Sequence, residues 1–124
     1  MKMQAINNEL QITLSRDEFL VIHQSLNEVC NGLYIQEFDK RIGEIDEAKK
    51  DLNRLEYIYN EHEKNDSNDP IIFTIIKKEI IRYRNAVRET CVEIDDWEFP
   101  TRVVGLPKSF ANQIVEDLNG IIDN

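Results

Sequence analysis

The sequence predicts a predominantly helical α+β fold that is built as a tandem pseudo-symmetric repeat. Three observations predict it: a short motif occurs twice, a strand-like stretch precedes each copy, and apolar residues at helical spacing follow each strand. Each unit is therefore expected to contain a strand, a long helix, a short helix and a further helix. The two strands are expected to form a small antiparallel pair.

The repeated motif reads EFDKRIG at residues 37–43 and EFPTRVVG at residues 98–105. A shift of 61 positions aligns residues 10–42 with residues 71–103 without a gap, and seven of these 33 positions are identical. Ordinary composition gives about two identities by chance. The identical pairs are Thr13/Thr74, Glu18/Glu79, Glu28/Glu89, Cys30/Cys91, Glu37/Glu98, Phe38/Phe99 and Arg41/Arg102.

The repeat predicts one domain, residues 1–124, that contains two units. The units span about 9–59 and 71–122, and a polar segment without periodicity, residues 60–70, links them. With 124 residues, the chain is long enough for one domain with a substantial core.

The first unit opens on residues 10–14, where apolar and polar residues alternate as in a half-buried strand. Ser15 and Glu18 then form a capping-box pattern, which predicts the start of a helix. Asn31 and Gly32 predict its end, because glycine accepts the left-handed turn after a helix. The apolar face of this helix is expected to contain Phe19, Ile22, Leu26, Val29 and Cys30.

The repeated motif itself predicts a short helix. Its glutamate precedes its arginine by four positions in both copies, which is the better orientation for an ion pair along a helix. The expected pairs are Glu37 with Arg41 and Glu98 with Arg102, and the phenylalanine of each copy is expected to enter the core. A longer amphipathic helix follows each copy. Its apolar positions are Ile45, Ala48, Leu52, Leu55 and Tyr59 in the first unit, and Phe110, Ile114, Leu118 and Ile121 in the second.

The second unit opens on residues 71–76, which are rich in β-branched residues and favour a strand. Because Asp69 and Pro70 also form a good helix start, one long helix over residues 70–94 is the alternative. The repeat favours a strand that pairs with residues 10–14. The helix after this strand has basic residues near its start and acidic residues at its end, which opposes the helix dipole. Charges elsewhere in the chain or on a partner are expected to compensate for them.

Composition narrows the functional classes. The formal net charge of −9 repels polyanions. No apolar run reaches the ~20 residues of a membrane-spanning helix, and the first residues lack the apolar core of a signal peptide, so we expect a cytoplasmic protein that does not bind membranes. Cys30 and Cys91 occupy equivalent places in the two units. We expect buried free thiols there, with a symmetric disulfide as the alternative.

Few residues point to catalysis. His23 lies near an apolar helix face and His62 lies in the linker, and both are interpreted as structural or surface histidines. Phosphate-binding loops, nucleophile elbows, HExxH and CxxC motifs do not occur. Residues 61–63 and 66–69 are acidic, but the second stretch lacks the glycine and final glutamate of a calcium loop. We therefore expect no catalytic residues, no cofactor and no metal site.

A short helix, a glycine turn and a longer helix also have the outline of a helix-turn-helix. The second helix of such a motif would have to present basic and amide groups to DNA. Here that helix carries more acidic than basic residues in both units, so direct nucleic-acid binding is not expected. A regulatory or adaptor protein with helix-turn-helix-like units, acting through protein partners or DNA, is the alternative function.

The most distinctive surface segment is residues 89–98, which contain five acidic residues, no basic residue and the only tryptophan of the chain, Trp97. Carboxylates around an aromatic anchor suit a protein that covers a basic patch on a partner, because the acids pair with Arg or Lys and the ring supplies buried area. A merely solvated charged face is the alternative. The predicted partner-binding residues are Glu93, Asp95, Asp96, Trp97 and Glu98, with Glu37 and Asp39 from the equivalent place in the first unit.

This profile of a short, acidic chain without a signal peptide or catalytic motif, together with the acidic residues at 93–98, resembles bacterial immunity proteins of contact-dependent growth inhibition and related polymorphic toxin systems. The resemblance implies a tight one-to-one complex with a cognate toxin, often a nuclease whose active site is basic. The carboxylates of the inhibitor would then stand where phosphates otherwise bind. The protein is expected to be non-enzymatic, and to be a monomer or homodimer when free.

Overall fold

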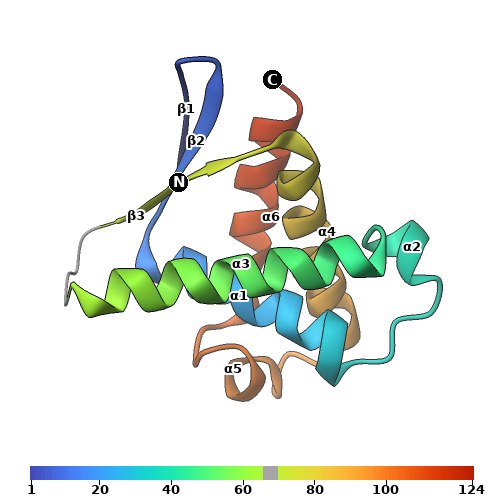
Figure 1. The fold of residues 1–124 in the computed structure, drawn as a ribbon. Coiled ribbons are helices and arrows are strands. Elements are labelled where there is room, and N and C mark those ends of the chain that lie inside the picture. The colour runs from blue at the N-terminus through green and yellow to red at the C-terminus, as the bar shows by residue number, and fades with distance from the viewer. Residues whose placement is uncertain (66–69) are drawn as a thin grey trace.

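The computed structural model describes residues 1–65 and 70–124 and has an α+β fold in which helices predominate (Figure 1). The described residues form six α-helices, one π-helical turn (η1) and three strands. In chain order these are β1 (Lys2–Ile6), β2 (Glu9–Leu14), α1 (Arg16–Asn27), η1 (Glu28–Gly32), α2 (Phe38–Arg41), α3 (Ile45–Lys64), β3 (Ile71–Ile75), α4 (Lys77–Glu93), α5 (Phe99–Arg102) and α6 (Lys108–Ile122).

The strands form one antiparallel sheet in the order β1-β2-β3. The predicted pairing of the two strands is confirmed, with Ile12 of β2 opposite Phe73 of β3. The alternative of one helix from residue 70 is wrong, because Ile71, Phe73 and Ile75 face the core while the residues between them are exposed. This alternation is what a strand with one buried face requires.

The first strand, β1, was not predicted from the sequence. It forms a hairpin with β2, and Asn7 and Asn8 make the two-residue turn with φ angles of 53° and 67°. Asparagine tolerates this left-handed conformation, which two-residue hairpin turns need. Figure 1 shows the hairpin projecting beyond the ends of the helices. Because most of β1 is exposed and only Met3 is partly buried, its sequence carries little hydrophobic alternation.

The core lies between the inner face of the sheet and the helices. Helix α4 packs against both α1 and α6, and α3 packs on α1 (Figure 1). The predicted capping box at the start of α1 is confirmed, since the Ser15 hydroxyl accepts from the Glu18 amide and the Glu18 carboxylate accepts from the Ser15 amide. The largest fully buried side chains include Tyr83, Phe19, Phe99, Ile12, Leu14 and Ile22.

Helix α3 is longer than the sequence predicted. It continues to Lys64, so residues 60–64 are helical although they were expected to belong to the linker. Their polarity fits the end of an exposed helix as well as it fits a linker, which is why composition did not distinguish the two. Residues 66–69, with the acidic stretch considered for ion binding, lie outside the described residues.

Charges from other elements compensate for the unfavourable charge order of α4. The Arg82 guanidinium lies 2.5 Å from the Asp51 carboxylate of α3. At the other end of α4, Arg41 of α2 lies 3.0 Å from Glu89 and 2.5 Å from Glu93. Tertiary ion pairs thus offset charges that oppose the dipole of the isolated helix.

The two cysteines are free thiols, as predicted, with Cys30 partly buried and Cys91 buried. Burial raises the pKa of the Cys91 thiol to about 11, because the thiolate would lose its hydration. Burial likewise raises the pKa of Cys30. Both sulfurs are therefore protonated near neutral pH, which suits a packing role and disfavours nucleophilic chemistry.

Tyr83 on α4 places its hydroxyl group in the core, which is expected to lower the stability of the fold. Its side chain is fully buried, and its hydroxyl has no hydrogen-bond partner among the described residues. Burial, followed by the nearby carboxylates of Glu79 and Asp51, raises the pKa of this phenol. A buried hydroxyl without a partner loses its hydration and gains nothing in return.

Replacing Tyr83 with phenylalanine is therefore expected to raise the free energy of unfolding by about 1 kcal/mol. The ring keeps its packing, and only the unsatisfied hydroxyl is removed. Urea unfolding followed by circular dichroism measures the change. The matched control is Tyr34→Phe, which removes the hydroxyl of an exposed tyrosine and should leave stability unchanged. A destabilised Tyr83→Phe variant would show that the hydroxyl forms a favourable bond.

Candidate interaction surface

The predicted contact residues of the second unit follow one another at the C-terminal end of α4 and in the turn before α5. Figure 1 places this turn and α5 at the bottom of the view, away from the sheet. Trp97 is the only tryptophan of the chain, and its side chain is 79% exposed. Val92, on the last turn of α4, is also exposed. A large aromatic side chain in water leaves apolar area available to a partner.

Several of the predicted acidic contacts already have partners within the chain. Glu93 accepts from Arg41, and Asp96 lies 2.7 Å from the ammonium of Lys108. Glu98 lies 3.7 Å from Arg102, so the ion pair predicted along this short helix is confirmed. Such pairs leave the second carboxylate oxygen open, and the Asp96 side chain remains almost fully exposed. Exposed pairs of this kind are weak and can be shared with a partner.

The ion pair predicted between Glu37 and Arg41 is wrong. Glu37 has a left-handed backbone, with a φ of 53°, and its carboxylate lies 3.4 Å from Lys40. Arg41 instead reaches across to the carboxylates of Glu89 and Glu93 on α4. The two charge-assisted hydrogen bonds that Arg41 donates to these carboxylates raise its pKa. Arg41 therefore forms tertiary contacts with the buried Glu89 and with Glu93, and it forms no local pair with the exposed Glu37.

The Arg41 contacts bring α2 next to the end of α4. Asp39 lies on α2 two positions before Arg41, and Arg41 binds Glu93, so the helix that carries Asp39 contacts the end of α4. Within the described residues, Asp39 and Asp95 form no ion pair. Among the predicted contact residues, their carboxylates are therefore the ones that no ion pair within the described chain occupies.

One exposed residue of this region was not predicted. Tyr34, in the segment between η1 and α2, is 85% exposed, which exceeds the exposure of Trp97. Its neighbour Ile35 is buried, so the chain alternates here without forming a strand. The sequence shows only that Tyr34 follows the predicted helix end at Gly32 by two positions. Because this segment has neither a helical nor a strand periodicity, the sequence does not indicate whether the ring is exposed.

A second ion pair joins this segment to α5. Arg102 of α5 binds the Glu28 carboxylate of η1 and lies 3.5 Å from the Gly32 carbonyl. Arg41 and Glu89 form a comparable pair between α2 and α4 at 3.0 Å. The two arginines thus hold the segments that carry Tyr34, Asp39 and Trp97 against the helices behind them.

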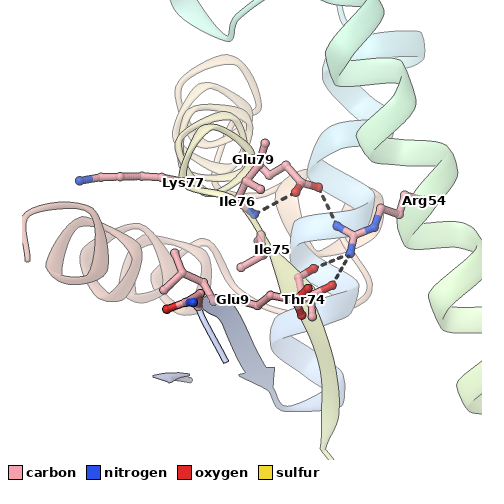
Figure 2. A pocket seen from close by; sticks show the side chains of 9 residues that line it. Glu9, Arg54, Thr74, Ile75, Ile76, Lys77 and Glu79 are labelled. Atoms are coloured by element: carbon pink, nitrogen blue, oxygen red, sulfur yellow. Dashed lines mark hydrogen bonds and ion pairs between the residues drawn. The ribbon is translucent and has the colours of Figure 1, made fainter. Parts of the chain in front are cut away.

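A hollow with a volume of about 440 Å³ lies elsewhere, between α3, β3 and the start of α4 (Figure 2). Arg54 crosses it and binds the Glu79 carboxylate at 2.7 Å and the Thr74 carbonyl. The Lys77 ammonium points away from this group (Figure 2). The charge of Arg54 is neutralised by Glu79, and among the described residues that line the hollow no nucleophile is paired with a base.

Comparison with protein-family models, with curated proteins and with solved structures gives no match for this chain. In residues 1–65 and 70–124, no helix has both the length and the apolar character needed to cross a membrane. No three His, Cys, Asp or Glu side chains come together as a metal site in the same part of the chain.

Proposed function

We propose that this protein is a cytoplasmic, non-enzymatic immunity protein that binds a cognate bacterial toxin and occludes its basic active site. The observation that carries the proposal is Trp97, which is 79% exposed next to the carboxylates of Asp95, Asp96 and Glu98. An aromatic ring supplies buried area in a complex, and surrounding acids select a cationic partner surface. A nuclease active site has such a surface because it binds phosphates.

The net charge of −9 supports the same proposal through the kinetics of binding. A strongly acidic inhibitor is attracted to a basic toxin over distances of about one Debye length, ~8 Å at physiological salt. This attraction raises the association rate, which matters for an inhibitor that must act before its toxin does. The same charge opposes binding to nucleic acid, the expected substrate of the toxin.

We also propose that the two halves are copies of one folding unit related by a pseudo-twofold axis. Each half has the order strand, long helix, short helix, helix. The central pair of β2 and β3, Ile12 and Phe73, is 61 positions apart, as the sequence repeat requires. The ion pairs Glu28–Arg102 and Arg41–Glu89 support the same relation, since a shift of 61 positions converts one pair into the other.

The test of the proposed function is binding to the protein encoded immediately upstream of its gene. The double variant Asp95→Lys/Asp96→Lys is expected to weaken this complex about 100-fold, because attraction becomes repulsion at the interface. Its association rate should also depend less on salt. Isothermal calorimetry and stopped-flow mixing measure the two effects.

The matched control is Glu9→Lys/Glu116→Lys. It changes the net charge by the same amount at two exposed positions, on β2 and on α6. It should lower the association rate slightly and leave the dissociation rate unchanged. Equal losses of affinity in both double variants would show that the surface around Trp97, Asp95 and Asp96 is not the interface.

A separate assay tests the helix-turn-helix alternative. Binding of duplex DNA in a mobility-shift assay at low salt would favour that alternative instead.

A further inference from the structure

Two aromatic side chains stand out as the most exposed large apolar groups of the described residues. Tyr34 is 85% exposed and Trp97 is 79% exposed. The next exposed aromatic residue, Tyr57, is 67% exposed and lies on α3. Tyrosine and tryptophan are enriched in binding sites because they bury much area and lose little side-chain entropy on binding.

The segments that carry Tyr34 and Trp97 are joined by a single side chain. Arg102 binds the Glu28 carboxylate and lies 3.5 Å from the carbonyl of Gly32, two residues before Tyr34. The same guanidinium lies 3.7 Å from Glu98, the residue after Trp97. The segments that carry the two aromatic residues therefore meet at the Arg102 guanidinium, one segment from each half of the chain.

We propose that Tyr34 and Trp97 are paired aromatic anchors of one interface, placed on either side of the Glu28–Arg102 ion pair. This inference rests on the proposed function and extends its interface to a residue of the first unit. The partner that fits is a protein surface with at least two arginine or lysine side chains. Their cationic groups can stack on the two rings while Asp95, Asp96 and Asp39 neutralise them.

The negative charge of this surface favours a cationic protein partner and disfavours dimerisation with a second copy of the chain. A symmetric dimer through this surface would place the carboxylates of Asp95 and Asp96 of one copy near those of the other. Like charges brought together at an interface cost binding energy. The chain also carries −9 as a whole, which adds to the repulsion. A cationic partner removes both penalties.

The surface is also held in place before binding. The Glu28 and Glu89 carboxylates are largely buried, and each binds an arginine from the other half of the chain. These contacts restrict the segments under Tyr34 and Asp39. An interface that is ordered in the free protein loses less entropy on binding and so retains more of its contact energy as affinity.

The test uses Tyr34→Ala and Trp97→Ala in the full-length protein, with Tyr57→Ala as the control. All three side chains are exposed, so thermal unfolding is expected to stay unchanged in each variant. Affinity for the protein encoded immediately upstream is measured by calorimetry. We expect about a 30-fold loss for Tyr34→Ala and for Trp97→Ala, and a change within about twofold for Tyr57→Ala.

The fluorescence of Trp97 gives an independent readout, because it is the only tryptophan of the chain. Its emission should shift to shorter wavelength in the wild-type complex as the ring leaves water. If Trp97→Ala weakens binding but Tyr34→Ala behaves like Tyr57→Ala, the paired anchor is wrong and the proposed function stands. If the wild-type protein does not bind the upstream product, both are wrong.

Discussion

Replacing Asp51 with alanine is expected to lower the free energy of unfolding by about 3–5 kcal/mol. The Asp51 carboxylate on α3 binds the Arg82 guanidinium on α4 through two bonds, with N–O distances of 2.5 and 3.0 Å. The side chains are 5% and 12% exposed. Removing the acid leaves a nearly buried cation without its counter-charge, and water cannot reach it well enough to replace the carboxylate.

The ion pair itself does not have to be a strong source of stability. Burial raises the pKa of Asp51, and the hydrogen bonds from Arg82 only partly oppose this effect. The carboxylate therefore loses hydration that the pair does not fully return. The large expected effect of Asp51→Ala comes from the stranded arginine. It follows that the double variant Asp51→Leu/Arg82→Met, which removes both charges and keeps the volume, should be close to the wild type in stability.

The control for Asp51→Ala is Glu47→Ala on the same helix. Glu47 lies 3.4 Å from Lys50 in an exposed pair, and losing it should change stability by no more than about 0.5 kcal/mol. Chemical unfolding in urea measures all three variants under one condition. A loss below about 1 kcal/mol for Asp51→Ala would mean that Arg82 finds water or another acceptor in the variant.

The regular elements could be predicted because their signals are local. The capping residues Ser15 and Glu18 and the helical spacing of Phe19, Ile22 and Leu26 depend only on neighbours in the sequence. The strand at residues 71–75 was more ambiguous, and the comparison with residues 10–14 decided it correctly. The hairpin strand β1 escaped prediction because a mostly exposed strand has no hydrophobic pattern.

The ion pairs could not be predicted in the same way. Arg41 and Arg102 occupy the same position of the repeated motif, yet only Arg102 contacts the glutamate four positions before it. Arg41 binds Glu89 and Glu93, which are distant in sequence. Which acid an arginine selects depends on burial and backbone geometry, and these become known only when the helices are packed.

For the candidate surface, the sequence predicted Trp97 as a partner-binding residue, and the side chain is exposed in the structure. Tyr34 was missed, because an aromatic residue outside a periodic segment can be buried or exposed with equal ease. The partners of Glu93 and Asp96 within the chain were missed for the reason that applies to Arg41. Sequence reasoning can therefore select exposed acidic residues, but it does not identify which of their charges are already paired within the chain.

Replacing Phe99 with alanine is expected to lower the free energy of unfolding by about 3–5 kcal/mol, and the equivalent Phe38→Ala is expected to cost less. Both phenylalanines were predicted to enter the core from the repeated motif. Phe99 is fully buried, whereas Phe38 is only partly buried at the edge of the core. The larger cost arises because the cavity left by a fully enclosed ring cannot fill with water or collapse completely.

Thermal and urea unfolding of the two variants provide the comparison, since each serves as a control for the other with the same chemical change. Phe38→Ala is expected to lower the free energy of unfolding by about 1–2 kcal/mol, because the partly buried Phe38 ring buries less apolar area than Phe99 does. The Lys108 ammonium lies 5.9 Å from the centre of the Phe99 ring, so Lys108→Met tests whether this contact adds to the difference. Equal losses for the two phenylalanines would contradict the unequal burial and would mean that α2 packs as deeply as α5.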